Sequence, residues 1–437
     1  MHCKKHTLFL SVMSLLLLVY CIWKPICYLD DIWVFGKSHA ALYGKFYNDV
    51  DIIVPPLSFW IIKGWLLICD NYLWYRVLGA ICWILILLTI SKICALLGKD
   101  DFYTLLIIIC YNFISNFYFD YNKLCLLLVC IMILIEIQSY KKKSILIGLL
   151  CGLCILSKHS IGGVVWIASM FLALSWKERG ICTGTMTIPL LLGTGFLLVN
   201  HQITEAYHQI FCGMSDFVNN LQIMPCIICL IFVMIYSILK GKKYQYNHKW
   251  KCIFVYGVAF LSICFPIFDY AHIFLGISIL TILAFDNKKE YLVLTTIGIT
   301  LFLAFHDIFI QHNVTTLEKT PYTNTRILEI IKINTDEVND SIAQLDAPVG
   351  SYCEDGMLFD IPFIKYANLP FTGNSGIYKQ MDVAKELLAT KEYILLKKEN
   401  ICSQIEPDVV EYIKENCVLV KDFPTHNLWK VKAGNEL

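Results

Sequence analysis

The sequence has few charged residues and no excess of either sign. Only 16% of its 437 residues are Asp, Glu, Lys or Arg, and 57% are hydrophobic. Soluble globular proteins carry about 25% charged residues, so this composition excludes an ordinary water-soluble enzyme. The formal net charge is +1, whereas a nucleic-acid-binding protein would show a basic patch or tail. Together with a mean hydropathy of +0.61, these values indicate a polytopic membrane protein.

Sequence features typical of linkers and disordered tails are also missing. We find no tract rich in Gly or Ser, no low-complexity segment and no internal repeat, and the content of Leu, Ile and Phe excludes a solvated polymer. Cysteine, by contrast, is frequent, with 20 residues. Most cysteines lie inside apolar runs such as Leu106–Cys110, Leu124–Cys130 and Leu149–Ile155. We therefore interpret them as small buried hydrophobic residues rather than as disulfide partners.

Apolar runs that can cross a membrane recur along the first 310 residues. A transmembrane helix needs about 20 mostly apolar residues, and on this basis we expect about eleven spans. They are Thr7–Trp23, Val77–Leu97, Phe102–Phe119, Leu124–Gln138, Ser144–Ser157, Ile161–Trp176, Thr183–Val199, Ile223–Leu239, Cys252–Phe268, His272–Phe285 and Tyr291–Ile310. Trp23-Lys24-Pro25 lacks the small residues of a signal-peptide cleavage site, so we expect the first span to be retained.

The distribution of Lys and Arg predicts the orientation of these spans. Basic clusters fall in alternate loops: Lys4/Lys5, Lys92/Lys99, Lys141–Lys143, Lys177/Arg179, Lys240–Lys251 and Lys288/Lys289. If these loops are cytoplasmic, the N-terminus lies inside and the C-terminus outside, and Leu57–Cys69 fits only as a re-entrant or interfacial helix. We therefore predict a multi-pass protein of the cell membrane, with an all-α transmembrane domain at residues 1–310.

The composition changes from about Gln311 onward, where charged residues become frequent and apolar runs become short. This pattern predicts a small extracytoplasmic α/β domain at residues 311–437. The expected strands are Val349–Cys353, Tyr393–Leu396, Cys417–Val420 and Leu428–Val431, and the expected helices are Thr325–Leu345 and Val409–Asn416. The domain holds Cys353, Cys402 and Cys417, so at most one disulfide bond can form within it.

Polar residues converge on the outer side of the predicted topology, where charge next to a membrane is costly and therefore informative. They are Asp30, Asp31, Arg76, Asp120, Lys158, His159, Asp269 and His272. Each also has an ordinary structural interpretation. Asp30 and Asp31 suit a helix N-terminus, Lys158 can extend to the interface, Asp120 can be a loop residue, and Asp269 with His272 can cap a helix. Their occurrence on one side favours a reaction site at the outer interface.

In the first outer loop, the acidic pair Asp30-Asp31 is followed by the segment Gly44–Tyr47 and then by Pro55-Pro56-Leu57. This order resembles that of the GT-C superfamily of membrane glycosyltransferases, which use polyprenyl-phosphate sugars. Asn71–Arg76 and Cys151–Lys158 resemble later motifs. Protein O-mannosyltransferases and lipid A aminoarabinose transferases are members. Several relatives place a lysine just before the Pro-Pro, where this chain has Val54, so a lipid A acceptor is not carried over.

The resemblance implies transfer of a sugar to an acceptor hydroxyl on the outer face, with inversion at the anomeric carbon. Asp30 is the expected general base, a role that contributes about 10²–10⁴-fold, and Asp31 orients the acceptor or serves as the alternate base. Cationic groups should oppose charge on the departing phosphate. The expected substrate-binding residues are Arg76, Lys158, His159 and His272 near the phosphate, Asp120 and Asp269 near the sugar or the cations, and Tyr28 and Pro56 from the first loop.

The expected partners are a polyprenyl-phosphate sugar donor, a glycan, lipid or protein acceptor, and the lipid bilayer, with no nucleic acid. We predict no metal ion and no other cofactor. Two further classes remain open. A transporter or flippase of a lipid-linked sugar or oligosaccharide would show inverted repeats and helices broken near the midplane. In a non-enzymatic outer scaffold, by contrast, Asp30 and Asp31 would tolerate substitution.

Overall fold

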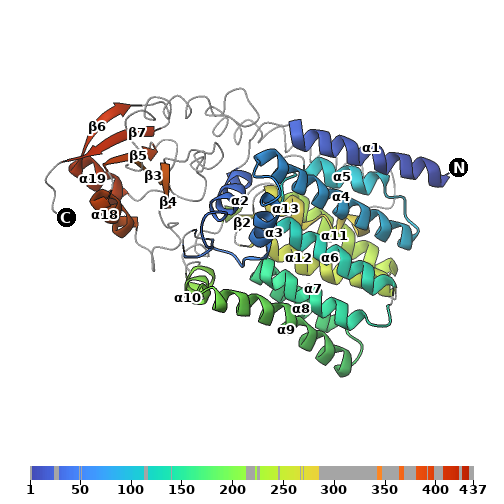
Figure 1. Cartoon of the computed structure of the whole chain (residues 1–437). Helices are drawn as coiled ribbons and strands as arrows, with labels where there is room; N and C mark the ends of the chain where they lie inside the picture. The colour runs from blue at the N-terminus through green and yellow to red at the C-terminus, as the bar shows by residue number, and fades with distance from the viewer. Residues whose placement is uncertain are drawn as a thin grey trace.

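A long helical part precedes a small sheet near the C-terminus (Figure 1). The computed structural model describes residues 2–23, 29–48, 50, 52–112, 117–138, 140–212, 222–223, 227–244, 247–265, 267–268, 270–284, 342–346, 364–368, 380–390, 392–397, 407–422 and 426–432. The predicted span Tyr291–Ile310 and the predicted strand Val349–Cys353 lie outside these residues.

Helices account for most of the described chain up to residue 284. They are α1 His2–Trp23, α2 Leu29–Ala40, α3 Leu57–Leu66, α4 Tyr72–Leu97, α5 Phe102–Asn112, α6 Tyr121–Gln138, α7 Lys143–Ser157, α8 His159–Leu172, α9 Trp176–Val199, α10 Ile203–Tyr207, the π-helix η1 His208–Cys212, α11 Ile227–Tyr244, α12 His248–Phe260, the 3₁₀-helix η3 Leu261–Cys264, α13 Tyr270–Gly276 and α14 Thr281–Ala284. A short parallel pair, β1 Gln222–Ile223 and β2 Ile267–Phe268, links two of the loops.

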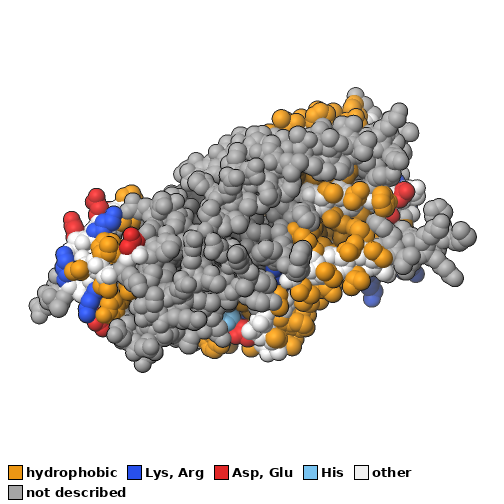
Figure 2. Space-filling view, turned by 90° about the horizontal axis from the view of Figure 1, so that it is seen from above, with side chains coloured by type: hydrophobic (Ala, Val, Ile, Leu, Met, Phe, Trp, Pro, Cys, Tyr) orange, Lys and Arg blue, Asp and Glu red, His pale blue; other side chains and the backbone are white. Residues whose placement is uncertain are grey.

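The apolar character of these helices fits a membrane environment. Among the described residues, Leu73–Leu97, Tyr121–Gln138 and Trp176–Val199 are long and apolar enough to span a bilayer, and several shorter apolar helices accompany them. Leu191 and Leu192 on α9 are 69% and 71% exposed, a costly arrangement in water and a favourable one against lipid. Figure 2 shows hydrophobic side chains gathered over the helical part. A mostly helical membrane protein is thus confirmed, while the number of spans and their orientation stay predictions.

Helix α6 forms the centre of the helical part. Its side chains are buried almost throughout, because α4, α7 and α12 all pack against it. The packing between α7 and α9 is closer still, since a Cβ at Gly148 or Gly152 would overlap backbone carbonyls of α9. Small residues four apart allow this kind of approach between helices in membranes. Both ends of α6 are therefore surrounded by protein, and whatever polar groups they carry must be satisfied there.

The segment Leu57–Cys69 contains the short helix α3, Leu57–Leu66, and its re-entrant or interfacial position stays a prediction. Ten residues rise about 15 Å at 1.5 Å per residue, about half the thickness of the hydrocarbon core. The chain then turns back into α4, and the stacked rings of Trp65 and Trp74, 4.6 Å between centroids, hold the turn. Each indole N–H donates to the other residue's carbonyl oxygen. In Figure 1, α2, α3 and α10 gather at one end of the helical body, and the N-terminus lies at the other.

Several predicted spans are wrong in their details. Helix α5 ends at Asn112, short of Phe119, and α11 begins at Ile227, because Gln222–Ile223 is a strand. The run Cys252–Phe268 divides into α12, η3 and β2, and the run beginning at His272 divides into α13, a turn and α14. Hydropathy measures total apolarity over a window, so it does not detect where a buried apolar segment leaves the helical conformation.

The C-terminal part contains a five-stranded mixed sheet with the order β4-β3-β5-β7-β6. Its elements are β3 Ile342–Asp346, β4 Ile364–Asn368, α18 Gln380–Thr390, β5 Tyr393–Lys397, α19 Pro407–Asn416, β6 Cys417–Asp422 and β7 His426–Val431. Strands β3, β4 and β5 are parallel, and β7 runs antiparallel to β5 and β6. Helices α18 and α19 share a separate apolar core with the sheet. The predicted mixed α/β character is confirmed here.

One C-terminal element was predicted wrongly. The helix expected at Thr325–Leu345 ends in a strand instead, because Ile342–Leu345 pairs with β4 on one side and β5 on the other. These partners lie far along the chain, and local periodicity does not reveal them. Every cysteine whose side chain the structure describes is free, and most are buried, as the apolar surroundings predicted. Cys353 and Cys402 lie outside the described residues.

Candidate functional site

Asp120 begins helix α6 and is bound on both of its carboxylate oxygens. Oδ1 accepts a hydrogen bond from the Lys123 backbone N–H at 2.7 Å, and Oδ2 lies 2.8 Å from the Lys123 ammonium. The side chains are 1% and 3% exposed. The ammonium also lies 3.6 Å from the ring centroid of Tyr118. Asp120 is thus a helix cap and one half of a sealed ion pair, so its negative charge is already used to hold a cation.

Lys158 lies at the junction of α7 and α8 and reaches the same turn of α6. Its ammonium donates to Asn122 Oδ1 at 3.0 Å and lies 5.3 Å from the ring centroid of Tyr121. The neighbouring Ser157 hydroxyl donates to the Tyr121 carbonyl oxygen at 3.1 Å. The junction breaks the helix because Lys158 adopts extended backbone angles. Two separate bonds therefore place Lys158 beside the first turn of α6.

Arg76 belongs to the first turn of α4 and is 4% exposed. Its neighbour Tyr75 donates from the phenol to the Phe119 carbonyl oxygen at 2.6 Å. One turn later, Gly79 allows the backbone of residues 117–119 to lie against α4, because a Cβ there would overlap the Phe117 carbonyl oxygen. The start of α4 is thereby fixed against the segment that leads into Asp120. The structure thus brings Arg76, Asp120 and Lys158 to elements that contact one another.

Asp30 and Asp31 lie in the first turn of α2, where the helix dipole favours negative charge. Their side chains, together with Tyr28 and Asp269, lie outside what the structure describes. The far end of α2 is better defined. His39 Nε2 lies 3.1 Å from the Asp70 carboxylate just before α4, and α2 packs against α3. The helix carrying the acidic pair is therefore attached to the elements that carry Arg76.

The loop between α2 and α3 is folded tightly on itself. Tyr47 has a positive φ of 68°, and its phenol donates to the Val54 carbonyl oxygen at 2.9 Å. Burial raises the pKa of this phenol well above its ordinary value. Gln209, which belongs to η1, bonds to the backbone of this loop twice. It donates to the Tyr47 carbonyl oxygen at 2.7 Å and accepts from the Ile52 N–H at 3.0 Å. Pro56 is buried at the start of α3.

The two predicted histidines lie on different elements. His159 begins α8 directly after Lys158, and its ring lies 5.4 Å from that of Phe211. Its Nδ1 is buried and has no hydrogen-bond partner in the described part of the chain. His272 lies on α13, where its carbonyl oxygen accepts a hydrogen bond from the Cys264 thiol. His159 is therefore the histidine that stands next to the Lys158 junction.

Comparison with known proteins identifies the fold. No family model matches the sequence, and neither does any curated protein. Among solved structures, the crystal structure of ArnT from Cupriavidus metallidurans bound to undecaprenyl phosphate matches with a TM-score of 0.63 at 10% identity, covering 99% of both chains. The apo structure of the same protein gives 0.60 at 9% identity, covering 98% of both chains. The chain has the fold of ArnT.

The likeness to ArnT spans the helical part and the C-terminal sheet alike, since it covers 99% of the chain. The fold that the first-loop resemblance implied is thus confirmed. At this sequence identity the likeness says nothing about individual residues, and the roles assigned to Asp30, Asp31 and the other site residues stay predictions.

Sequence reasoning missed several residues that shape this region. Lys123 follows Asp120 by three residues, and this spacing is a usable sign of an ion pair. Asn122 and Tyr121 carried no such sign, because their partner Lys158 comes 36 residues later. Gln209 is farther still, 157 residues from Ile52. Contacts of this range become visible only once the helices are placed.

Proposed function

We propose that the protein is an inverting membrane glycosyltransferase that transfers a sugar from polyprenyl phosphate to an acceptor on the outer face of the membrane. The observation that carries this proposal is the fold shared over 99% of the chain with ArnT, whose crystal structure is bound to undecaprenyl phosphate. ArnT is a lipid A aminoarabinose transferase of the GT-C type. The sugar, the carrier length and the acceptor of this protein are left open.

Asp30 is the proposed general base. A free hydroxyl is a poor nucleophile, and a carboxylate that takes its proton during attack on the anomeric carbon supplies about 10²–10⁴-fold. Asp30 and Asp31 lie in the first turn of α2, where the helix dipole favours negative charge. Asp31 orients the acceptor or serves as the alternate base. One displacement of this kind inverts the anomeric configuration.

Lys158 and Arg76 are proposed to stabilise the phosphate as it gains negative charge. The Asn122 oxygen, 3.0 Å from the Lys158 ammonium, positions this cation beside the first turn of α6. Asp120 is already paired with Lys123, which supports a role in holding cations rather than in taking a proton. The buried Nδ1 of His159 would gain a hydrogen-bond partner from a bound substrate.

The remaining predicted residues are assigned to the substrates as well. His272 is a proposed second donor to the phosphate, Asp269 is proposed to position the sugar hydroxyls, and Tyr28 and Pro56 are proposed to shape the donor site from the first loop. We propose that the N-terminus lies in the cytoplasm and that the C-terminal α/β domain lies on the outer side of the membrane. The apolar helices then form the groove for the polyprenyl tail, and no metal ion or other cofactor is proposed for this step.

The experiment that tests this function uses the purified full-length protein in lipid nanodiscs with a panel of polyprenyl-phosphate sugars labelled in the sugar. The proposal expects one donor class to transfer its sugar to water or to an acceptor hydroxyl added to the assay, leaving unlabelled polyprenyl phosphate. A parallel reconstitution in liposomes measures whether intact labelled donor crosses the bilayer. Translocation of intact donor without cleavage would contradict the proposal and favour a flippase.

A further inference from the structure

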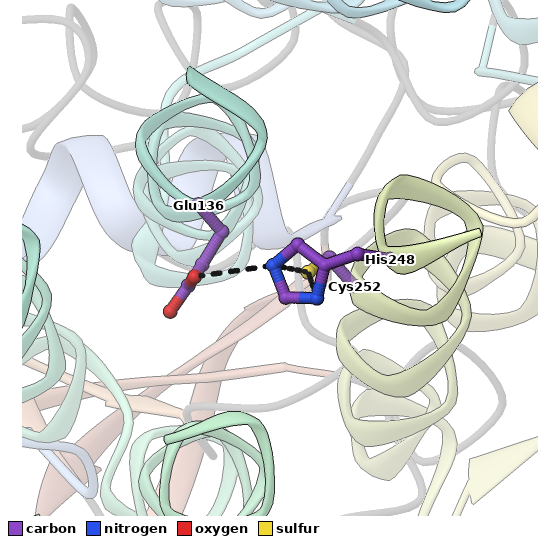
Figure 3. Close-up of side chains that lie close together, drawn as sticks. All are labelled: Glu136, His248 and Cys252. Carbon is purple, nitrogen blue, oxygen red and sulfur yellow. Dashed lines mark hydrogen bonds and ion pairs between the residues drawn. The ribbon is translucent and has the colours of Figure 1, made fainter. Parts of the chain in front are cut away.

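A second polar cluster lies at the other end of α6, away from Asp120. Glu136 is on the last turn of α6, and His248 and Cys252 are on the first turns of α12 (Figure 3). Each offers one metal-binding atom, and these atoms all lie within 4.8 Å of one another. Nothing in the proposed glycosyl transfer uses these residues. The cluster therefore needs an explanation of its own.

The local sequence explains how α12 contributes two of the three groups. Asn247 caps the helix by accepting the Lys249 N–H at 2.9 Å, so the helix begins at His248 and the four-residue spacing places His248 and Cys252 on one face. That face meets α6, since the two helices pack together. The Cys252 Sγ lies 3.4 Å from His248 Nε2, and Nε2 lies 3.9 Å from Glu136 Oε2.

The sulfur–nitrogen separation of 3.4 Å falls within the edge lengths of a metal coordination tetrahedron, and the nitrogen–oxygen separation of 3.9 Å is slightly longer. Zinc binds imidazole nitrogen and carboxylate oxygen at about 2.0–2.2 Å and thiolate sulfur at about 2.3 Å, and tetrahedral geometry then spaces neighbouring ligand atoms by about 3.3–3.7 Å. Imidazole, carboxylate and thiolate together suit zinc better than magnesium or calcium, which prefer oxygen alone. Nε2 is the His248 nitrogen nearer to Cys252 Sγ and also the one that faces Glu136 Oε2, so an ion held by Nε2 lies near both other groups.

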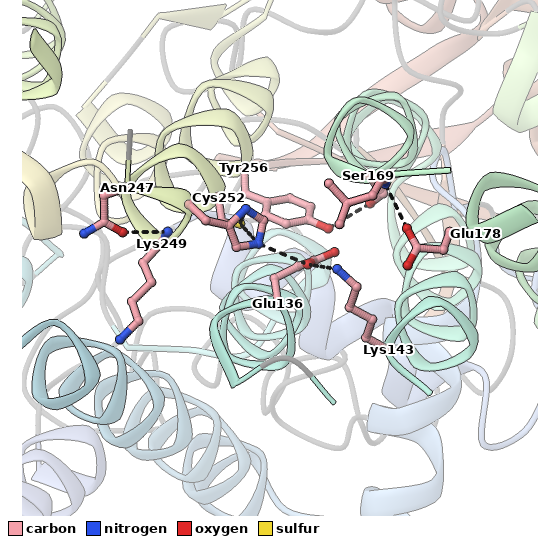
Figure 4. A network of polar contacts seen from close by, with 10 residues as sticks. Glu136, Lys143, Ser169, Glu178, Asn247, Lys249, Cys252 and Tyr256 are labelled. Carbon is pink, nitrogen blue, oxygen red and sulfur yellow. Dashed lines mark hydrogen bonds and ion pairs between the residues drawn. The ribbon is translucent and has the colours of Figure 1, made fainter. Parts of the chain in front are cut away.

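The three side chains differ in their exposure to solvent. The Glu136 side chain is 4% exposed and Cys252 is fully buried, whereas the His248 side chain is 43% exposed. An isolated carboxylate with so little contact with water is costly. Here, Lys143 from the start of α7 offsets that cost at 2.9 Å from Glu136 Oε2 (Figure 4). The exposed imidazole leaves a path from solvent to the cluster.

We propose that Glu136, His248 and Cys252 bind one zinc-class divalent ion that joins α6 to α12, with water as the fourth ligand. Binding converts the Cys252 thiol to a thiolate and releases its proton to solvent, so the added charge on the site is one unit. The Lys143 ammonium repels the incoming cation and competes for the Glu136 oxygen. Lys143 therefore weakens binding and is not a ligand. This site lies outside the outer region for which no metal is expected.

The test measures binding of Co²⁺ and then Zn²⁺ to the full-length protein in nanodiscs. Wild type should bind one Co²⁺ with a thiolate-to-cobalt charge-transfer band, and Zn²⁺ should displace it. Cys252→Ser should lose this band, and Glu136→Gln should weaken binding by at least about tenfold, the lower end of what even outer-shell changes cost. Cys229→Ser removes a buried thiol of α11 outside the cluster and should bind Co²⁺ as wild type does.

Cys252→Ser or Glu136→Gln could lose metal binding because the protein misfolds. Lys143→Met separates the two explanations, because it is expected to gain affinity. Removing the competing ammonium should raise Zn²⁺ affinity, which an unfolded protein would not do. A thiolate band that survives in Cys252→Ser would assign the metal to other cysteines and overturn the proposal. Wild type without the band, or Lys143→Met with weaker binding than wild type, would show that the cluster is an ion pair with a neighbouring thiol and no metal site.

Discussion

The two ends of helix α6 each carry a buried carboxylate paired with a lysine, but the pairs are built differently. At the first end, Asp120 and Lys123 come from the same turn, and both side chains are at most 3% exposed. At the second end, Glu136 takes its lysine from α7, and a His248 side chain that is 43% exposed stands beside it. The first pair is sealed and local, whereas in the second the Lys143 side chain is 15% exposed and the exposed His248 of a third helix lies beside it.

The difference indicates what each pair is suited to do. The sealed Asp120–Lys123 pair, with the Tyr118 ring against its ammonium, fixes the start of α6. Lys158 and the first turn of α4, which carries Arg76, also contact this region. The second pair, with a thiol and an imidazole nearby, can exchange its ammonium for another cation. Rigid charge at the first end supports proposed substrate positioning, and exchangeable charge at the second end supports metal binding.

The largest expected effect on stability follows from removing the lysine at the sealed end. Lys123→Met leaves the Asp120 carboxylate buried without its cation, and loss of one partner of a buried pair costs about 3–5 kcal/mol. Lys143→Met should cost less, because the Lys143 side chain is 15% exposed and that pair is less completely removed from water than Asp120–Lys123. Thermal unfolding of both variants in the same detergent measures the comparison. Equal losses of stability would show that the two ends do not differ.

Lys158→Met separates catalysis from stability at the first end of α6. Loss of the bond to Asn122 should cost only about 0.5–1.5 kcal/mol of folding stability. If the ammonium stabilises the departing phosphate, transfer should fall by about 10²–10³-fold, as for removal of other such groups. Lys143→Met serves as the matched control and should keep a rate close to wild type. A transfer loss in the control as large as that in Lys158→Met would contradict the division of labour between the two ends.

Gly79→Ala tests the close approach that holds residues 117–119 ahead of Asp120. A methyl group there meets backbone, which moves less easily than a side chain, and overpacking of this kind costs about 1–3 kcal/mol. Gly163→Ala on α8 is the control, since a Cβ there meets nothing within 4 Å and alanine favours helix by up to about 1 kcal/mol. Chemical or thermal unfolding should rank the control above wild type and Gly79→Ala below it.

The smallest effect concerns the second bond that attaches the α7–α8 junction to α6. Ser157→Ala removes the donor to the Tyr121 carbonyl oxygen and should cost about 0.5–1.5 kcal/mol. Thr187→Ala removes an exposed hydroxyl bonded within its own helix α9 and should cost less. The measurement is the same unfolding assay, and a greater loss for Thr187→Ala would mean that the junction does not depend on this contact.

Sequence reasoning recovered the parts of the molecule that depend on local composition. The helical membrane character, the short α3, the strands at Tyr393, Cys417 and Leu428 and the buried free cysteines all follow from runs of neighbouring residues. The interruptions at η3 and β2 and the strand Ile342–Leu345 do not, because each depends on a distant partner. The Asp120–Lys123 pair can be predicted from its i,i+3 spacing. Glu136, His248 and Cys252 cannot be grouped in this way, because Glu136 and Cys252 lie 116 positions apart and the three residues are of different types.

The predicted roles of the site residues depend on a different kind of information. Arg76, Asp120 and Lys158 were grouped by the side of the membrane on which the positive-inside rule places them, and the structure brings their elements into contact.

The most direct test of the central claim compares wild type with Asp30→Asn in donor cleavage. Both proteins are reconstituted with a polyprenyl phosphate carrying a labelled sugar, and release of the sugar from phosphate is followed together with donor binding. We predict cleavage by wild type, with a loss of about 10²–10⁴-fold in Asp30→Asn and donor binding retained. Cleavage by Asp30→Asn at the wild-type rate would contradict the account, because the first-loop carboxylate would then have no part in the reaction.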